Sequence, residues 1–292
     1  MQDRLPIWLK KSHSVPKNMS FTTSSIRGLD LHTVCEEARC PNKVECFGKR
    51  HATFLILGNG CTRSCRFCSI EHNNPKAVDL DEAVNVAKAA KALNLRYVVI
   101  TSVTRDDLED GGSGQFVLTM KELRNAIEDI KIEVLIPDFK GNKGSIQDVL
   151  DMKPVILNHN IEMVKELYPF WRFESDYRLS INLLKSVREE SGVVTKSGFM
   201  LGLGECMDEV RHLIDDLSSA GISILTIGQY ISPSRHHPRV VRYYHPDEFD
   251  EIRELAIREG IPYVLSAPFV RSSYKAYETY LSAVSGLINK DK

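Results

Sequence analysis

The sequence predicts an α/β fold in which helices cover a parallel β-sheet. From residue 53 onward, short apolar runs alternate with amphipathic segments, and the runs are apolar throughout, as expected for strands that are buried on both faces. The repeated alternation favours a full or partial barrel. With 292 residues, of which 42% are hydrophobic, the chain can bury the core of one large or two ordinary domains.

Seven apolar runs are predicted to be strands: residues 53–57, 97–101, 131–136, 155–157, 198–203, 222–227 and 263–267. Helices are predicted between them, at residues 81–93, 114–129, 145–151, 178–190, 207–220 and 246–259. The first of these opens with acidic residues, which interact favourably with a helix N-terminus. Because the loops after barrel strands share one mouth, we expect loops 102–112, 138–144 and 158–162 to meet the loop after the first strand.

Residues 1–50 show no sustained periodicity and include a stretch rich in serine and threonine at 19–25. We expect this part to be an irregular extension folded around a metal site.

The composition excludes several classes of protein. No stretch approaches the roughly 18 apolar residues that a membrane span requires, and the first residues do not resemble a signal or transit peptide. The formal net charge is −1, so the chain lacks the basic field that non-specific nucleic-acid binding needs. We therefore expect a cytoplasmic protein with neither membrane nor nucleic acid as its main partner.

Three cysteines follow the first predicted strand with the spacing Cys61-x3-Cys65-x2-Cys68. Three thiolates can hold a four-iron cluster and leave its fourth iron open to another ligand. This spacing therefore indicates chemistry at an open iron rather than a purely structural site.

Another triplet, Cys35, Cys40 and Cys46, lies upstream and is the first of the two in chain order, so that six of the seven cysteines fall within 34 residues. Structural zinc is an alternative, but it usually takes four ligands from Cys-x2-Cys pairs. Disulfides are another, but they suit small secreted domains. We interpret both triplets as iron–sulfur ligands, and Cys206, the remaining cysteine, as a buried apolar filler.

The segment from Cys61 to Cys68 resembles the signature of the radical S-adenosylmethionine (SAM) superfamily, with Phe67 as the aromatic residue before the last cysteine. The resemblance implies that the open iron chelates the methionine moiety of SAM and that an electron from the cluster yields a 5′-deoxyadenosyl radical. The segment 198–205 resembles the superfamily's cofactor-binding glycine segment, with Met200 where isoleucine is usual, although a glycine-rich turn is an alternative.

The first triplet, together with Arg271-Ser272-Ser273-Tyr274, resembles the lipoyl synthase family. On its own the serine motif would be interpreted as a helix cap. The resemblance covers about residues 31–276, with further matches at 52–58, 101–108, 110–112, 137–139, 158–160, 162, 226–230 and 242–243. It implies a partial (β/α)6-type TIM barrel at 51–267, an N-terminal extension at 1–50 and a C-terminal segment at 268–292, both extensions binding an auxiliary cluster.

The resemblance also implies an activity, namely the insertion of two sulfur atoms at C6 and C8 of a protein-bound octanoyl chain. Its cofactors would be two 4Fe-4S clusters and SAM, with the auxiliary cluster as the sulfur donor. Ser272 would be the fourth ligand of that cluster, with Ser273 as the alternative. The implied cofactor contacts are Thr104, Asn158, Gly198, Gly202 and Glu205.

The implied partners are an octanoylated lipoyl carrier domain (a 2-oxoacid dehydrogenase E2 subunit or the glycine cleavage H protein), an electron donor such as ferredoxin or flavodoxin, and an iron–sulfur carrier. An unactivated methylene has no acidic proton, so acid–base catalysis cannot functionalise it. We therefore expect an apolar channel between the clusters. Residues 235–239, with two arginines and two histidines, are expected to be a solvated loop that meets an acidic carrier surface.

Two other functions are compatible with parts of the sequence. One is another sulfur-inserting radical enzyme, such as one acting on a biotin precursor, although the upstream triplet and the serine motif argue against it. The other is a non-catalytic iron–sulfur or zinc module, which metal analysis would distinguish.

Overall fold

The computed structural model of the protein describes residues 5–11, 15–72 and 74–288. Its main sheet has eight strands in the order β1-β2-β5-β6-β7-β8-β9-β10. Seven are parallel: β2 (Thr53–Ile56), β5 (Tyr97–Ser102), β6 (Lys131–Leu135), β7 (Ile156–Asn158), β8 (Val194–Leu201), β9 (Ile224–Gln229) and β10 (Tyr263–Ser266). The short β1 (His32–Thr33) pairs antiparallel with β2 at one edge. All seven predicted strands are confirmed.

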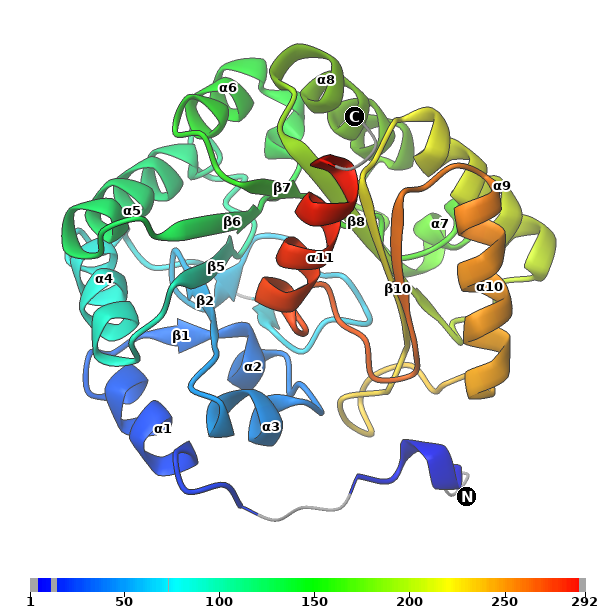
Figure 1. Ribbon diagram of the computed structural model, residues 1–292, viewed down its shortest axis with the longest axis horizontal. Coiled ribbons are helices and arrows are strands. Elements are labelled where there is room, and N and C mark those ends of the chain that lie inside the picture. The colour runs from blue at the N-terminus through cyan, green and yellow to red at the C-terminus, as the bar shows by residue number, and fades with distance from the viewer. Residues whose placement is uncertain (1–4, 12–14, 73, 289–292) are drawn as a thin grey trace.

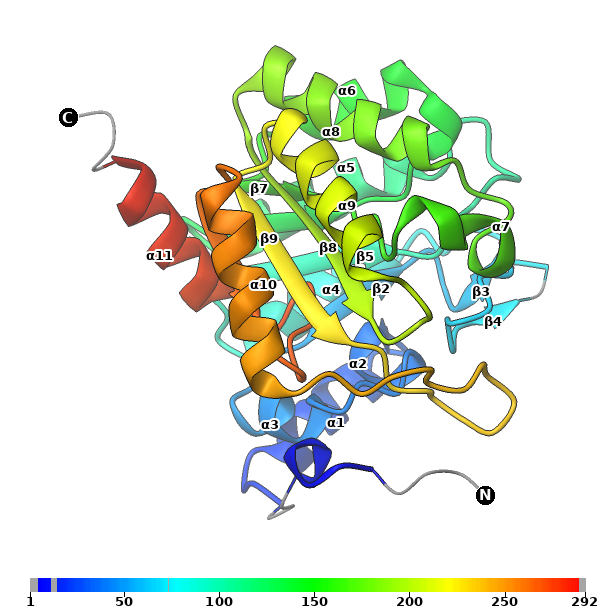
Figure 2. The same ribbon diagram turned by 90° about the vertical axis from the view of Figure 1, so that its right-hand side faces the viewer.

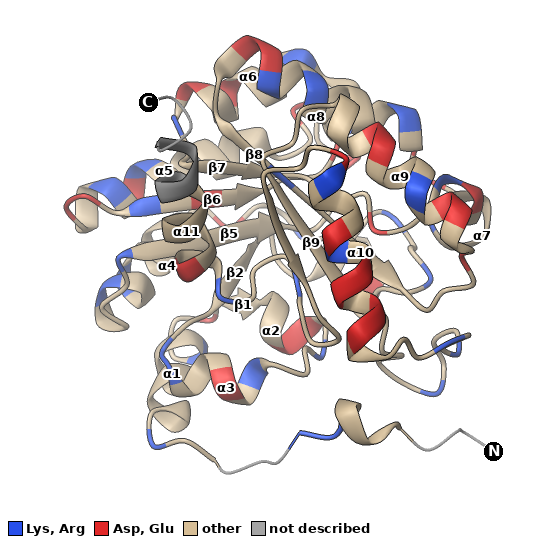
Figure 3. Ribbon diagram, turned by 45° about the vertical axis from the view of Figure 1, so that its right-hand side comes forward, with Lys and Arg blue, Asp and Glu red and all other residues tan. Residues whose placement is uncertain are grey.

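Six helices follow the strands in turn and form the outer ring of the barrel (Figure 1). They are α4 (Glu82–Ala92), α5 (Ser113–Ala126), α6 (Lys143–Asp151), α8 (Tyr177–Ser191), α9 (Met207–Ser219) and α10 (Pro246–Arg258). Their apolar faces pack on the sheet in two large clusters, one around β2, β5 and β6 and the other around β8 and β9. Basic and acidic residues are interspersed over the outer faces (Figure 3). The predicted partial (β/α)6-type barrel is confirmed.

The prediction that residues 1–50 are irregular was wrong, because this part contains η1 (Ile7–Leu9), α1 (Met19–Arg27), α2 (Val34–Glu37) and α3 (Lys43–Gly48). The serine- and threonine-rich stretch is helical in α1, where hydroxyls donate to carbonyls one turn back, as Thr23 does to Met19 at 2.9 Å. Thr22 is buried and also donates to the Phe47 carbonyl at 2.8 Å. That bond joins α1 to the end of α3.

The helix α11 (Ala276–Ile288) lies at the amino ends of the strands. The ring of Tyr97 packs between those of Tyr277 and Tyr280, with centroids 5.6 and 5.4 Å apart, and Ala283 packs with Ile156 and Ile224. Figure 2 shows α11 on the opposite side of the barrel from β3 (Gly60–Cys61) and β4 (Glu71–His72). The barrel therefore has one end next to α11 and an opposite end that carries the cysteine loop.

The interior of the barrel is polar at its centre. The fully buried Lys196 and Glu133 form an ion pair of 2.9 Å, and the hydroxyl of Tyr97 donates to Glu133 at 2.6 Å. These polar residues explain why β8 begins four residues before its predicted start, since Thr195, Lys196 and Ser197 are buried without forming an apolar run. Removing one partner of such a pair typically costs 3–5 kcal/mol because the other charge is left buried alone.

The remaining short elements are η2 (Phe139–Gly141), η3 (Lys165–Leu167) and α7 (Tyr168–Trp171), all in loops at the mouth. Among the helices of the described residues, none has the length and apolar character that crossing a bilayer would require.

His159 gives the stability of the fold a pH dependence. It is buried, with Nδ1 2.9 Å from the Ile136 carbonyl and Nε2 3.0 Å from the Ser180 hydroxyl, and burial lowers its pKa from 6.5 to about 4. The unfolded chain therefore binds a proton that the folded chain excludes, so stability is full above pH 6.5 and is lost as the pH falls toward 4. Between pH 7 and 5 we expect this histidine to account for a loss of about 2 kcal/mol in the free energy of unfolding.

Urea unfolding at both pH values measures this loss. The pH dependence should weaken in His159→Gln and persist in His236→Gln, which changes an exposed histidine. Equal pH dependence in the wild type and His159→Gln would contradict the assignment.

Candidate functional site

The cysteine loop leaves the barrel through a tight turn after β2. Leu57 and Gly58 have left-handed backbone angles, with φ of 67° and 76°. Their amide groups donate to the carboxylate of Glu82 at 2.9 and 3.2 Å. Glu82 is buried at the start of α4, so the first helix of the barrel fixes the direction in which the loop begins.

The middle of the loop is held by Arg63, whose side chain is 6% exposed. Its guanidinium donates to Asp106 at 2.7 and 3.1 Å and to Asp138 at 2.6 and 2.7 Å. Burial alone would raise the pKa of Asp138, but the hydrogen bonds and charge of Arg63, together with the Lys140 amide and the charge of His159, outweigh it and lower that pKa to about 2. Because the two aspartates follow β5 and β6, the barrel itself positions the loop.

Further contacts come from the loops after β5, β7 and β9. The amide and the hydroxyl of Thr62 donate to the Thr104 carbonyl at 3.1 and 3.0 Å, and the Arg66 amide donates to the Trp171 carbonyl at 3.0 Å. Nε2 of His237 lies 3.0 Å from the Cys68 carbonyl. The predicted convergence of these loops at one mouth is confirmed, whereas the expectation that residues 235–239 are only a solvated loop is wrong for His237.

A cavity of about 370 Å³ connects the two cysteine triplets. Cys68 lines one part of it, and Cys35, Cys40 and Cys46 line another. The lining also includes residues at the carboxyl ends of the strands, namely Thr101 and Ser102 on β5, Leu135 on β6 and Met200 on β8. The cavity therefore opens at the mouth of the barrel, between the triplets.

The donor sets suit iron–sulfur clusters. Within each triplet the thiols are electrostatic neighbours, and burial raises the pKa of Cys35, Cys46 and Cys68 to about 12. No three His, Cys, Asp or Glu side chains in the described part of the chain converge closely enough to hold one metal ion. A four-iron cluster does not need such convergence, since each thiolate binds a different iron.

Arg172 faces the second triplet and was not predicted from the sequence. Burial raises the pKa of the Cys65 thiol, and the positive charge of Arg172 is the main effect that opposes this rise. Nε of Arg172 is buried without a hydrogen-bond partner among the described residues. A cation with an unused N–H group beside the thiols matches the negative charge of a thiolate-bound cluster. No motif surrounds Arg172, so its role could not be predicted from the sequence.

Asn160 and Glu162 were also missing from the predicted contacts, although they lie in a stretch that matched the family. The side-chain amide of Asn160 donates to Glu162 at 3.0 Å, and its side-chain oxygen Oδ1 is buried without a partner among the described residues. Burial raises the pKa of Glu162. Both residues line the main cavity and also a small cavity of about 70 Å³ that contains Gly198, Met200 and Ser272.

Of the predicted cofactor contacts, Gly198 lines the small cavity, and the other four line neither that cavity nor the main one. A Cβ atom there would lie 2.3 Å from the Thr226 hydroxyl.

Glu205 instead accepts from the amides of Gly202, Leu203 and Gly204 at 2.6, 2.9 and 3.1 Å. Gly202 has a φ of 101° and packs against Gln229. Asn158 is buried, 3.4 Å from Glu133, and Thr104 is held by Thr62.

The serine motif joins the two ends of the sequence at the cavity. Ser272 and Ser273 both line it, and the electrostatic neighbours of Arg271 include Cys40 and Glu162. The hydroxyl of Tyr274 lies 3.0 Å from Glu45, a residue 229 positions earlier in the chain. The segment that follows β10 is thereby attached to α3 and the first triplet.

The expectation that Cys206 is a buried filler was wrong. It is exposed and occupies the N-cap position of α9, where its amide donates to Glu209 at 2.7 Å. A capping role requires no burial, which explains the difference.

The fold and the cysteine loop are those of a radical SAM enzyme. The model of the Radical SAM superfamily matches residues 55–217, and a model of the N-terminal domain of lipoyl synthase of the Radical SAM family matches residues 1–40. The chain is 52% identical to the lipoyl synthase of Aquifex aeolicus over 88% of this chain and 94% of that protein. It is 46% identical to the lipoyl synthase of Caldicellulosiruptor saccharolyticus over 96% of this chain and 98% of that protein. The chain therefore belongs to the lipoyl synthase family, and it is a radical SAM enzyme that inserts sulfur.

Solved structures share the fold at much lower identity. The structure of methylornithine synthase matches with a TM-score of 0.54 at 13% identity, covering 87% of this chain and 79% of that one. The FeFe-hydrogenase maturase HydG from Carboxydothermus hydrogenoformans matches with a TM-score of 0.51 at 11% identity, covering 93% and 84%. These matches concern the fold alone.

We expect Arg63→Gln to lower the free energy of unfolding by about 3–5 kcal/mol, because it leaves two carboxylates without their buried partner. Urea unfolding measures the effect. Arg66→Gln, an exposed arginine three positions later in the same loop, is the matched control and should change stability by less than about 0.5 kcal/mol. Adding Asp138→Asn to Arg63→Gln should recover part of the loss. Equal effects of Arg63→Gln and Arg66→Gln would show that the loop does not depend on this ion pair.

Proposed function

We propose that this enzyme inserts sulfur at C6 and C8 of a protein-bound octanoyl chain and that a second, auxiliary 4Fe-4S cluster is the sulfur donor. The single observation that carries the proposal is the cavity lined by all three cysteines of the first triplet and by Cys68 of the second. A chain bound in that cavity would lie within reach of both sites. In this proposal Cys61, Cys65 and Cys68 hold the radical cluster, and Cys35, Cys40 and Cys46 hold the auxiliary one.

When bound, the radical cluster and SAM supply a 5′-deoxyadenosyl radical, which is the oxidant that an unactivated methylene requires. The chain's own residues position the reactants and exclude water. Gly198 and Met200, near the end of β8, would contact the cofactor, and Arg172 places a positive charge beside Cys65. The predicted roles of Thr104, Asn158, Gly202 and Glu205 as cofactor contacts remain part of the proposal.

The cavity is suited to an octanoyl chain because much of its lining is apolar. Its apolar side chains include Val34, Ala38, Leu55, Ile70, Leu135 and Met200. Burying eight carbons against such side chains is favourable by about 0.8 kcal/mol per methylene. The cavity thereby binds the octanoyl chain along its length. The distance of each carbon from the two triplets then decides which carbons are attacked.

We further propose the division into an N-terminal extension (1–50), a barrel (51–267) and a C-terminal segment (268–292), whose outermost residues lie outside those described. The proposed partners are an octanoylated E2 subunit or H protein, a ferredoxin or flavodoxin as electron donor and an iron–sulfur carrier that rebuilds the auxiliary cluster. All of these proposed partners are consistent with a cytoplasmic location, which we also propose.

The two triplets should fail in different ways when mutated. We expect Cys68→Ala to abolish the cleavage of SAM, because the radical cluster loses a ligand. Cys40→Ala should leave cleavage measurable but stop sulfur insertion. Both are measured with an octanoyl-lysine peptide, SAM and dithionite, by mass spectrometry of 5′-deoxyadenosine and of the peptide. Equal loss of both products in the two variants would contradict this division of labour.

The same assay distinguishes the two serines. Both line the main cavity, and Ser273 also lines a second cavity together with Cys35 and Cys46. We expect Ser272→Ala to impair sulfur insertion while SAM cleavage continues, because Ser272 is the proposed fourth ligand. Normal sulfur insertion in Ser272→Ala together with loss of insertion in Ser273→Ala would show that Ser273, and not Ser272, is the ligand. Normal insertion in both variants would contradict serine ligation.

A further inference from the structure

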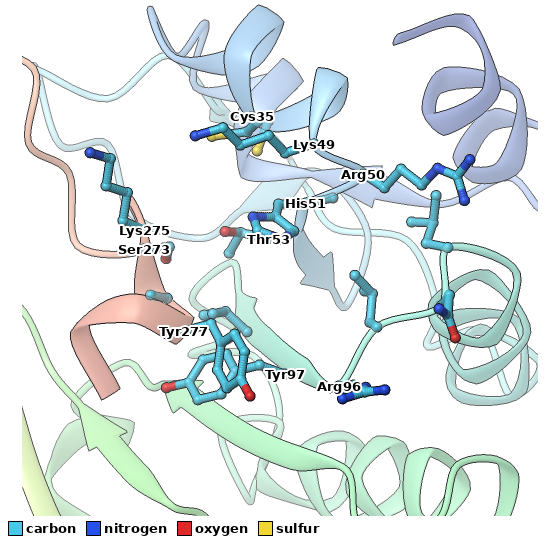
Figure 4. Close-up of a pocket in the computed structure, with 17 residues that line it drawn as sticks. Cys35, Lys49, Arg50, His51, Thr53, Arg96, Tyr97, Ser273, Lys275 and Tyr277 are labelled. Carbon is cyan, nitrogen blue, oxygen red and sulfur yellow. The ribbon is translucent and has the colours of Figure 1, made fainter. Parts of the chain in front are cut away.

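A second large cavity, of about 320 Å³, opens at the end of the barrel next to α11. Its lining comes from the segment before β2, the turn before β5 and the start of α11. Figure 4 shows Cys35 on one side of this space, Tyr97 and Tyr277 on the other, and His51, Thr53 and Ser273 between them. The cavity therefore reaches a thiol of the first triplet from the amino ends of the strands.

The two large cavities share four lining residues, which are Cys35, Cys46, Thr53 and Ser273. The first triplet thus lies between them. Cys68 lines only the cavity at the mouth, where the octanoyl chain and SAM are proposed to bind. The auxiliary site therefore has two approaches from opposite ends of the barrel, and only one of them passes the radical site.

The second approach is positively charged. Lys49, Arg50, Arg96 and Lys275 line the cavity and are exposed, and no aspartate or glutamate is among its lining residues. Lys49 also pairs with Glu45 at 3.3 Å, and Arg50 packs over the ring of Phe21. Arg96 and Lys275 form no ion pair with a carboxylate of the described residues. A concave site lined by charges of one sign raises the local concentration of small ions of the opposite sign.

We propose that this second cavity is an anion entrance to the auxiliary cluster site and that hydrosulfide is the anion it admits. The inference rests on the proposed function, in which the auxiliary cluster gives up sulfur, and it concerns sulfide that reaches the site as the free anion, whereas the proposed iron–sulfur carrier would deliver iron and sulfur together. Entry next to α11 brings hydrosulfide to Cys35 and Cys46 without crossing the cavity of the substrate. The four cations attract the anion, and the tyrosine rings and Thr53 form the walls of the passage.

The test follows the recovery of the auxiliary cluster after one turnover. Spent holoenzyme is given ferrous iron and increasing hydrosulfide without oxygen, and the return of iron–sulfur absorption and of acid-labile sulfide is timed. Replacing Lys49, Arg96 and Lys275 together by glutamine should lower the rate at limiting hydrosulfide on the order of 10-fold. Added salt should slow the wild type toward the variant, because the attraction is screened.

The matched control replaces Lys88, Lys121 and Lys185 by glutamine, which removes the same charge from exposed positions on α4, α5 and α8. Its recovery rate should equal that of the wild type. Arg96→Gln and Lys275→Gln alone should each slow recovery about two- to threefold, so the result does not depend on the triple variant folding.

Equal rates of cluster recovery for the triple variant, the single variants and the control would show that the second cavity is not an anion entrance. The proposed function is judged separately by the dithiolated product of the first turnover. Its absence in the wild type would refute sulfur donation, whereas the entrance is judged from the recovery rates alone.

Discussion

The loop that carries Cys61, Cys65 and Cys68 has almost no regular structure, yet its three thiols have to keep fixed positions relative to the barrel. Arg63 supplies that constraint through four hydrogen bonds to two carboxylates, at 2.6 to 3.1 Å. Burying these charges is costly, and only close, well-oriented bonds offset the cost. Since Asp106 and Asp138 follow adjacent parallel strands, the register of β5 and β6 fixes where the cysteine loop can lie.

The first triplet, Cys35, Cys40 and Cys46, is held differently, by contacts between the two ends of the sequence. Asn42 donates to the Phe269 carbonyl at 2.7 Å, and Tyr274 donates to Glu45. The N-terminal extension and the segment after β10 thus contact each other across the edge strands of the open barrel. Through this contact the first triplet lies on the same cavity as Cys68.

The sequence predicted much of the fold, because apolar runs report directly on buried strands, and the cysteine spacing led to ligand assignments that stay predictions. It failed where side chains act through tertiary contacts. The helix α1 was missed because its hydroxyls bond within the helix and to α3, and the start of β8 was missed because Lys196 is buried against Glu133. Arg172 belongs to no motif, and only the folded chain brings it to Cys65. Glu205 accepts from three amides of its own turn, and its role as a cofactor contact stays a prediction.

The central claim is that two thiolate-bound clusters face one cavity and that one of them is consumed. The most direct test is to count iron and acid-labile sulfide per chain, without oxygen, before and after a single turnover with an octanoyl-lysine peptide. The account predicts about eight of each before turnover, and about two fewer sulfides for each dithiolated peptide formed. About four of each at the start, zinc in place of iron, or an unchanged sulfide content after product formation would contradict it.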